Sequence, residues 1–585
     1  MSTGTGAGQR RRRRVRLTPM RPVPVEFAGG RAREGPLTLG QLNMCIWLSR
    51  IPDHPYGILC AELPVPTVVS VGDVAQAIAV LITRHESLRT TYLPGERPRQ
   101  RVAAAGVQML EVCSLGQGQW GPPDRPAVAE ALVRWLRESP EPGRRPERMA
   151  VAIAPGTGDR VIACAARFTH LTIDHGAIEI IKRDFAGLLG DPACRPAGQP
   201  GHQPVDQAKL EATPAERHRA EAALEHQREQ SWRIPHCLYA LPGARTSGES
   251  LVVELSSAAA AMAVRQIAAR TRTSRSSVVL AAICAVIARR AGYQELVFPL
   301  LSSNRFERHL TNYVGSLVGT SCATVEIGAR SFDELAGHTW IRVAQASRHG
   351  SYDVAKQAAV DKPVEYERGL RLNYDPLFNS LVSESWSGLT AGVGFQPGDI
   401  DVALSRTELR WRPLPFSGTQ IQFRLIQIDG RLRLDMWGAL VSRAELESVL
   451  LAVERLLAAA APGDLAGTRM PEIIGLEPIA GTPDRILVDH CWVEVTDVRC
   501  LVDDAVAPAA AHVFASASGR PLVAHLTATG AVRTPEQAHA RCMAALERHP
   551  TAITPRHYVI CRTAPADPAD PAAWPEPLAA GTGRA

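Results

Sequence analysis

The sequence has no Cys-x-x-Cys pair, and its twelve cysteines are scattered singly along 585 residues. Structural metal sites and disulfide frameworks both depend on clustered or regularly spaced cysteines. We therefore expect reduced thiols, no bound metal and a cytoplasmic location. The Gly-x-x-x-x-Gly-Lys-Ser/Thr phosphate loop, the His-Glu-x-x-His zinc helix and the Gly-x-Ser-x-Gly nucleophile elbow are missing as well. These absences argue against the enzyme classes that carry those signatures.

Long apolar runs are also missing, and none approaches the ~20 residues that a helix needs to cross a bilayer. Much of the formal net charge of +6 comes from an arginine run at residues 10–16, so the rest of the chain is close to neutral. A neutral body attracts nucleic acid weakly. We therefore expect neither a nucleic-acid partner nor a membrane association. Because proline and arginine interrupt the residues after the run, where a secretory signal has its apolar segment, we interpret it as a flexible basic arm.

The length predicts several domains, because a chain of 585 residues exceeds the roughly 100–200 residues of one domain. The hydrophobic fraction of 45% and charged fraction of 21% are ordinary for globular protein. The composition changes along the chain and suggests the boundaries. The predicted parts are a disordered basic arm at 1–35, a first half at 36–200, a linker with a polar helix at 201–245, a second half at 246–470, a small appendage at 476–563 and a disordered tail at 564–585.

Local patterns predict a mixture of helices and strands, as in an α/β (α+β) fold. The segments 420–425 and 431–437 alternate in hydrophobicity on either side of Asp429-Gly430, which predicts a hairpin. Residues 190–212 are rich in glycine, proline and glutamine, which favours a loop. Helices are predicted at 36–48 with Thr38 as cap, 74–82, 214–230, 257–271, 275–291 and 443–460, and strands at 161–168, 250–255 and 296–301.

The most informative motif is Thr169-His170-Leu171-Thr172-Ile173-Asp174-His175-Gly176, which lies between a predicted strand and a predicted helix. A histidine four residues before an aspartate can also be an exposed loop or a satisfied core histidine. This segment, however, resembles the His-His-x-x-x-Asp-Gly signature of the condensation domains of nonribosomal peptide synthetases and their chloramphenicol-acetyltransferase-like relatives. That family continues with an aliphatic residue and a second aspartate, which match Ile181 and Asp184.

Three further segments carry the resemblance. Pro36 to Trp47 is similar to the opening helix of the family, with Gln41 at the position of its glutamine. Arg84-His85-Glu86-Ser87-Leu88-Arg89-Thr90-Thr91-Tyr92 and Leu300–Arg305 with Val314–Val318 match later blocks in order and spacing. The resemblance covers roughly 36–470 and implies a free-standing condensation domain with two chloramphenicol-acetyltransferase-like lobes arranged in a V. The site is then expected at the interface of the lobes, in a tunnel open at both ends.

The resemblance also implies roles for the site residues. His170 takes the place of the catalytic histidine, which acts as a general base or positions the substrate and stabilises charge. Asp174 takes a structural place and is expected to pair with an arginine, for which Arg89 and Arg305 are the candidates.

Four other residues are expected along the substrate channel, namely Thr169, His175, Gly176 and Asn304. Two of them depart from the family pattern. Thr169 stands where the family has its first histidine, which mostly packs. His175 stands where the family has glycine, a residue that often marks close backbone approach or a special dihedral angle. His175 is either a ligand contact or a sign of lost activity, and Gly176 is expected to absorb part of the backbone strain.

The implied function is an acyltransferase of specialised-metabolite, including antibiotic, biosynthesis. It would join an acyl thioester, held on an acyl or peptidyl carrier protein or on a CoA-type carrier, to a small amine or alcohol. No bound cofactor is implied, and the phosphopantetheine thioester belongs to the donor carrier protein. The main alternative is a non-catalytic module of the same fold that recruits a carrier protein or tailoring enzyme. Epimerisation of a carrier-bound aminoacyl group, performed by a related branch, is a third possibility.

Residues 476–563 carry a weaker likeness, to the small C-terminal subdomain of adenylate-forming enzymes. The segments 484–488, 493–498, 520–526, 534–536 and 553–559 follow the order of that subdomain. The large ATP-binding part is missing, and no lysine follows Lys362, so the catalytic lysine is missing too. We therefore expect no adenylation and interpret this part as a docking or structural remnant, with an unrelated small α/β appendage as the alternative.

Overall fold

The computed structural model describes residues 15–28, 30–50, 57–116, 124–138, 147–154, 158–190, 201–238, 251–382, 398–414, 421–438, 441–479, 484–515 and 522–584. The chain forms two compact units. Unit 1 contains residues up to Arg217 together with Ser303–Val318, and unit 2 contains His218–Ser302 and the chain from Gly319 onward. Ser303–Val318, which we call the inserted segment, therefore packs with unit 1 although its sequence neighbours belong to unit 2. The V arrangement and the tunnel stay predictions.

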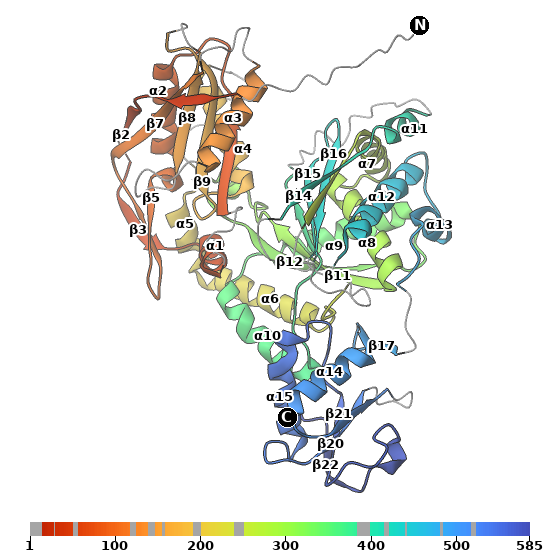
Figure 1. Ribbon diagram of the computed structural model, residues 1–585. Coiled ribbons are helices and arrows are strands. Elements are labelled where there is room, and N and C mark those ends of the chain that lie inside the picture. The colour runs from red at the N-terminus through yellow and green to blue at the C-terminus, as the bar shows by residue number, and fades with distance from the viewer. Residues whose placement is uncertain are drawn as a thin grey trace. The chain divides into compact units, whose positions relative to one another are not determined.

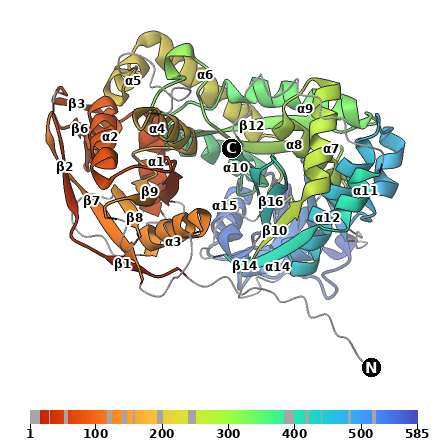
Figure 2. The same ribbon diagram turned by 90° about the horizontal axis from the view of Figure 1, so that it is seen from above.

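Unit 1 is built on a six-stranded sheet in the order β1-β7-β8-β9-β4, with β2 also pairing with β7 (Figure 1). Helices α2 and α4 pack on one face of this sheet and α3 packs on the other (Figure 2). Because both faces are covered, β9 is buried from Val161 to Phe168, and its side chains do not alternate between apolar and polar. The strands are β1 (Leu17–Pro19), β2 (Val23–Phe27), β4 (Ile58–Leu63), β7 (Gly106–Leu115), β8 (Arg148–Ile153) and β9 (Val161–Thr169).

A small sheet in the order β3-β6-β5 and several helices complete unit 1. Helix α1 begins with a reciprocal cap, because the backbone N–H of Thr38 donates to the Gln41 side chain and the N–H of Gln41 donates to the Thr38 hydroxyl. The elements are β3 (Arg33–Pro36), β5 (Thr90–Leu93), β6 (Arg99–Val102), α1 (Leu39–Arg50), α2 (Val71–Arg84), the 3₁₀ turn η2 (Glu86–Arg89), α3 (Arg125–Glu138), α4 (His175–Leu188), α5 (Pro204–Glu211) and, in the inserted segment, η4 (Arg308–Leu310). Helix α6 (Pro214–Ser231) begins at the end of unit 1 and runs into unit 2.

Unit 2 contains a seven-stranded sheet in the order β12-β11-β13-β15-β16-β10-β14. The predicted hairpin is confirmed, since β15 and β16 pair antiparallel around Gly430, whose φ is 72°. The strands are β10 (Leu251–Ser257), β11 (Glu295–Ser302), β12 (Gly319–Glu326), β13 (Leu377–Ser380), β14 (Glu408–Pro413), β15 (Gln422–Gln427) and β16 (Leu432–Trp437). The helices are α7 (Ala258–Thr271), α8 (Arg275–Ala291), α9 (Phe332–Ser347), α10 (Val354–Arg368), α11 (Asp399–Leu404), α12 (Arg443–Ala460) and α13 (Met470–Ile474), with the turn η6 (Gly467–Arg469).

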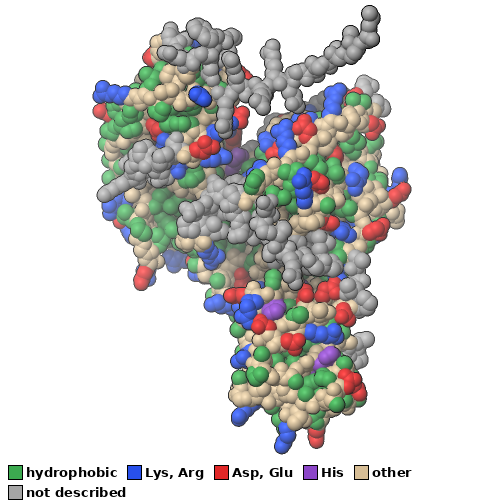
Figure 3. All heavy atoms as spheres, viewed as in Figure 1, with side chains coloured by type: hydrophobic (Ala, Val, Ile, Leu, Met, Phe, Trp, Pro, Cys, Tyr) green, Lys and Arg blue, Asp and Glu red, His purple; other side chains and the backbone are tan. Residues whose placement is uncertain are grey.

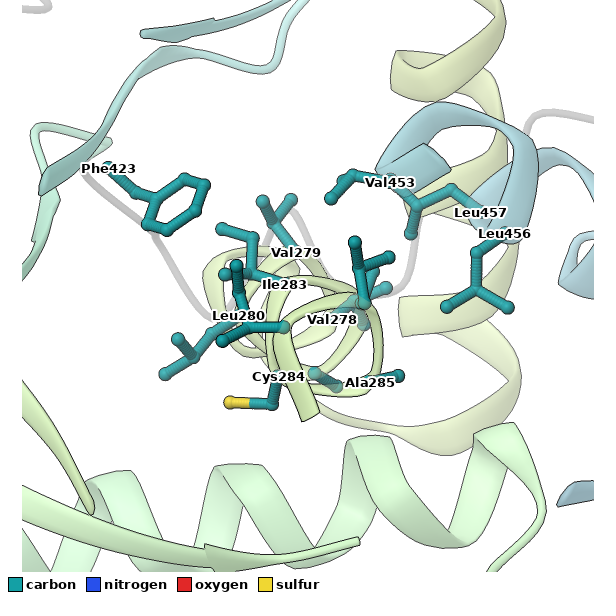
Figure 4. Close-up of a cluster of buried hydrophobic side chains, with 14 of the residues drawn as sticks. Val278, Val279, Leu280, Ile283, Cys284, Ala285, Phe423, Val453, Leu456 and Leu457 are labelled. Atoms are coloured by element: carbon teal, nitrogen blue, oxygen red, sulfur yellow. The ribbon is translucent and has the colours of Figure 1, made fainter. Parts of the chain in front are cut away.

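Helix α8 is the centre of the unit 2 core. Its side chains are apolar nearly all round, and nearly all of them after its first turn are buried. Figure 4 shows Ile283 and Val279 of α8 toward Phe423 of β15, while Val453 of α12 lies on another side of the helix. A helix that is apolar all round requires such burial on every side.

The C-terminal part of unit 2, residues 484–584, has its own core (Figure 1, blue). A four-stranded sheet in the order β19-β20-β21-β22 packs against α14 and α15, and Leu370 of the preceding part joins that core. We call this part the appendage. Its elements are β17 (Arg485–Val488), β18 (Cys491–Glu494), α14 (Val495–Val506), β19 (Ala511–Phe514), β20 (Val523–Thr527), α15 (Pro535–Ala545), η7 (Leu546–Arg548), β21 (His557–Cys561), η8 (Pro571–Ala573) and β22 (Pro577–Gly581).

Three segments expected to lack regular structure carry some. Strands β1 and β2 extend the sheet of unit 1 by pairing with β7, and β2 buries Val25 and Phe27. Residues 204–211 form α5, which begins with Pro204 at a position where proline favours a helix. Strand β22 pairs with β21 near the C-terminus. The edge strand of a sheet can pair with another segment of the chain through backbone hydrogen bonds. The amino-acid composition of that segment does not reveal such pairing.

Acid is expected to destabilise the junction between the appendage and the rest of unit 2. The Nε2 atom of His236 lies 2.7 Å from the Thr551 carbonyl oxygen, and that of His539 lies 2.8 Å from the Tyr366 carbonyl oxygen. Burial lowers the pKa of each histidine to about 4. A histidine whose folded-state pKa is lowered stabilises the fold above its unfolded pKa, and this stability is lost as the pH falls below about 6.5.

Each histidine therefore contributes a loss of about 2 kcal/mol in the free energy of unfolding between pH 7 and pH 5. Urea denaturation at a series of pH values measures this slope. His236→Gln and His539→Gln are each expected to reduce it. An unchanged slope in both variants would contradict the assignment.

On the face shown in Figure 3, basic and acidic side chains are interspersed. Within the described residues, no group of His, Cys, Asp or Glu side chains is arranged to hold a metal ion, and every cysteine is a free thiol. No single described helix is long and apolar enough to span a membrane, although α7 and α8 meet that criterion as a pair bent by 106°.

Candidate active site

His170 lies in a tight loop between β9 and α4, where the sequence pattern placed it. Its backbone N–H donates to the carbonyl oxygen of Gly57 at 2.8 Å. The N–H groups of Thr172 and Ile173 both donate to the carbonyl oxygen of Thr169, at 3.0 and 3.3 Å, and close the turn. The loop is therefore fixed through its backbone, and the position of His170 does not depend on its own side chain.

Asp174 ends this loop and caps helix α4. Its Oδ1 atom accepts the backbone N–H of Ala177 at 2.8 Å and a hydrogen bond from the Arg305 guanidinium at 2.5 Å. Its Oδ2 atom accepts the backbone N–H of Leu317 at 2.9 Å. A carboxylate that is 4% exposed and accepts three hydrogen bonds is suited to order the loop rather than to take a proton from a substrate.

Arg305 is the arginine that pairs with Asp174, and it comes from the inserted segment. Its guanidinium also donates to the carbonyl oxygens of Tyr313 at 2.7 Å and Gly315 at 3.1 Å. Arg89, the other candidate, does not reach Asp174. Its guanidinium donates to the carbonyl oxygens of Ala103 and Arg31 and has Glu86 at 3.9 Å. The buried Arg89 and the half-buried Arg305 thus have different roles, which their sequence blocks did not distinguish.

Gly176 is the position in the motif that excludes a side chain. A Cβ atom there would lie 2.5 Å from Nε of Arg305. His175, which replaces the family glycine, is the first residue of α4 and is half-buried. Its φ is not positive, so the strain expected at this residue does not occur. The requirement for glycine thus lies at residue 176 of this chain.

The other two predicted channel residues have structural contacts. The hydroxyl of Thr169 accepts the backbone N–H of Leu171 at 3.3 Å. Asn304 has a left-handed backbone with φ of 51°, and its side-chain amide donates to the Leu317 carbonyl at 2.8 Å. Asparagine tolerates this backbone region better than most residues. Thr169 therefore shapes the loop of His170, and Asn304 shapes the inserted segment.

The environment of His170 favours its neutral form. Burial lowers its pKa, and positive charge on His175 lowers it further, while Asp174 and the backbone at His170 and Ile173 act in the opposite direction. Its Nδ1 atom is buried and has no hydrogen-bond partner within the described residues. A neutral imidazole near neutral pH is the form that accepts a proton.

Residues outside the predicted site also hold this region. The Tyr92 hydroxyl donates to the Leu171 carbonyl at 3.3 Å, and the Thr172 hydroxyl donates to Glu147. Asp184 forms an ion pair with Arg84 at 3.3 Å and lies 3.0 Å from Nε2 of His85. Asp184 and the Arg84–Tyr92 block were noticed in the sequence, but pairing between them could not be derived from one sequence. No sequence signal marked Glu147.

Loss of charge at Asp174 is expected to destabilise unit 1. Asp174→Asn retains the size of the side chain but removes the charge that Arg305 and the helix N-terminus stabilise, so we expect the free energy of unfolding to fall by about 2–3 kcal/mol. Urea denaturation followed by tryptophan fluorescence measures this change. Asp159→Asn, at an exposed position in the same unit, is the control. Equal losses in the two variants would contradict the role given to Asp174.

Comparison with protein-family models and with curated sequences gives no match. Solved structures do match. The condensation domain that mediates chain release from the enacyloxin polyketide synthase is 19% identical with a TM-score of 0.54, over 74% of this chain and 83% of that one. SgcC5 from Streptomyces globisporus is 17% identical with a TM-score of 0.53, over 73% of this chain and 99% of that one.

A variant of the starter condensation domain of rhizomide synthetase, in complex with C8-CoA and Leu-SNAC, is 16% identical with a TM-score of 0.53, over 76% of this chain and 96% of that one. At such identities the likeness establishes the fold. It extends over about three quarters of this chain and nearly all of two of the three relatives. The chain therefore has the fold of these condensation domains.

Proposed function

We propose that this protein is an acyltransferase that condenses an acyl thioester with an amine or hydroxyl acceptor in the assembly of a specialised metabolite. The observation that carries the proposal is the position of His170 at the end of β9, in a loop that Asp174 and Arg305 hold in place and where burial lowers the pKa of the imidazole. The condensation-domain fold supports it, because the similar structures are condensation domains of natural-product synthetases.

The acceptor attacks the thioester carbonyl carbon while its N–H or O–H proton passes to the neutral imidazole of His170. The new C–N or C–O bond forms, the tetrahedral intermediate collapses, and the C–S bond breaks. The sulfur leaves as a thiolate and takes the proton back from the imidazolium, directly or through water. The product is an amide or ester together with a free thiol, and His170 is again neutral.

Asp174 takes no part in this proton transfer. Its two oxygens already accept hydrogen bonds from Ala177, Arg305 and Leu317. Asp174 acts by holding the loop between β9 and α4, so that His170 keeps its position relative to α4.

The donor is proposed to be the phosphopantetheine thioester of an acyl or peptidyl carrier protein, with a CoA thioester as the small-molecule equivalent. The complex of the rhizomide starter domain with C8-CoA and Leu-SNAC supports this class of donor. The acceptor is a small amine or alcohol.

The test is a panel of acyl-pantetheine, acyl-CoA and carrier-loaded thioesters combined with amine and alcohol acceptors, with products identified by mass spectrometry. Transfer by the wild-type protein but not by His170→Ala would support the proposal and reveal the acceptor class. The departures at Thr169 and His175 favour a second candidate, a non-catalytic module that recruits a carrier protein. Carrier binding that His170→Ala leaves unchanged, without any product, would support that module instead.

A further inference from the structure

The imidazole of His170 lies close enough to the backbone at His170 and Ile173 for these groups to raise its pKa. No described residue forms a hydrogen bond with its buried Nδ1 atom, although such a bond commonly orients a functional histidine. The ring does lie against an aromatic side chain. The centroids of the Trp47 and His170 rings are 6.5 Å apart, and the ring planes meet at 72°, an edge-to-face arrangement.

Trp47 lies on α1, and the first turn of that helix is anchored to the rest of unit 1. The backbone N–H of Leu39 donates to the carboxylate of Glu211, on α5, at 2.8 Å. The Gln41 side chain, besides its part in the cap, donates to Gln100 at 3.3 Å. These contacts fix the end of α1 opposite to Trp47.

Gly40 brings the same turn against the inserted segment. A Cβ atom at residue 40 would lie 2.3 Å from the carbonyl oxygen of Ser316 and 2.7 Å from Cα of Leu317. Both obstacles are backbone atoms, so a side chain could be accommodated only by moving the helix or the segment. Leu317 is also the residue whose N–H donates to Asp174. One short stretch of backbone therefore supports both α1 and the loop of His170.

We propose that Trp47 is a positioning residue for His170: α1 presents its indole to the imidazole and fixes the direction in which the ring faces the substrate. The inference rests on the proposed function, because it assigns a role in proton transfer. Trp47 touches His170 and acts through it. An edge-to-face pair restrains the imidazole without competing for its proton, in place of the hydrogen bond that Nδ1 lacks.

The test compares Trp47→Leu, Trp47→Phe and the control Trp135→Leu. Trp135 is a half-buried tryptophan of α3 in the same unit, packed under Arg148 at 5.3 Å. Because a small misplacement of a reacting group is costly, we expect Trp47→Leu to lower kcat by about 10- to 100-fold with little change in KM. Trp47→Phe keeps an aromatic edge and is expected to retain more of the rate. Trp135→Leu is expected to keep the wild-type kcat, and thermal unfolding checks that each variant is folded.

A second readout does not require turnover. Diethyl pyrocarbonate acylates neutral, accessible imidazoles, and peptide mass mapping gives the rate of modification at His170. We expect this rate to increase in Trp47→Leu and to stay at the wild-type value in Trp135→Leu. Faster modification in Trp47→Leu together with no transfer on any substrate would reject the proposed function and still support the positioning role. An unchanged modification rate in Trp47→Leu would overturn the positioning role, as would equal losses of kcat in Trp47→Leu and Trp135→Leu.

Discussion

Replacing His170 with alanine is expected to lower kcat/KM for acyl transfer by about 10²–10⁴-fold, the range that a positioned general base contributes. This corresponds to about 3–5 kcal/mol of transition-state stabilisation. The fold should be preserved, because the loop is held by the backbone bond from His170 to Gly57 and by Asp174, neither of which involves the imidazole. Steady-state kinetics on a substrate found in the panel measure the effect.

The pH dependence of kcat/KM gives an independent check on the same residue. Catalysis needs the neutral imidazole, and burial lowers the pKa of His170, so the wild-type rate should fall only below the ordinary histidine pKa of about 6.5. His170→Ala should lose this acid limb together with most of its rate. The control is His218→Ala, at an exposed histidine outside unit 1, which should keep both the acid limb and the wild-type rate. A His170→Ala variant with the wild-type rate and pH profile would show that His170 is not the base.

Much of the fold could be predicted because the pattern of each element is local. The apolar run of β9, the Thr38 cap of α1 and the Gly430 turn each depend on residues within a few positions of one another. Strands β1 and β2 could not be predicted in the same way. They are added to the edge of β7 by backbone hydrogen bonds, and little in their composition distinguishes them from an irregular arm.

The site shows the same division. The position of His170 between a strand and a helix follows from the sequence, and so does a structural role for Asp174. The choice between Arg89 and Arg305 does not, because it depends on the inserted segment reaching the loop from a distant part of the sequence. The contact between Trp47 and His170 likewise joins residues far apart in the sequence. A single sequence carries no signal for such pairs.

The structure also changes how the residues that depart from the family motif are interpreted. A histidine in place of a motif glycine suggests strain when only the sequence is known. In the structure the close approach falls on Gly176, against Arg305, while His175 has an ordinary backbone. The altered motif is therefore compatible with an ordered loop, and the kinetic test of His170 decides whether the loop is active.

Replacing Arg368 with alanine is expected to lower the free energy of unfolding of unit 2 by about 2–4 kcal/mol, because it leaves two buried carbonyl oxygens without their donor and takes one partner from the half-buried carboxylate of Asp489. Arg368 ends α10 and is 1% exposed. Its guanidinium donates to the carbonyl oxygens of Ser231 and Ile234, and to both the carboxylate and the carbonyl oxygen of Asp489. One side chain thus joins α10, the end of α6 and the appendage.

The turn that Arg368 holds is strained. Asp489 and His490 connect β17 to β18 and have φ values of 49° and 62°, a conformation that two-residue hairpin turns usually assign to asparagine and glycine. A strained turn persists when its surroundings fix it. Arg368 holds this turn from one side. Arg556 holds it from another side, with its guanidinium 2.8 Å from the Asp489 carboxylate. Without Arg368, the turn loses its main support, and the two carbonyl groups of the α6 end lose their donor.

Chemical denaturation of the full chain measures the loss, with limited proteolysis of residues 484–515, at the start of the appendage, as a second probe. Arg371→Ala is the matched control, because Arg371 is 45% exposed and pairs with Glu365 at the surface, where an ion pair contributes little. A loss below about 1 kcal/mol in Arg368→Ala, equal to that of the control, would contradict the prediction. A large loss, with new cleavage in that stretch, would mean that the appendage is a structural part of unit 2, held in one position, rather than a subdomain that swings as a separate body.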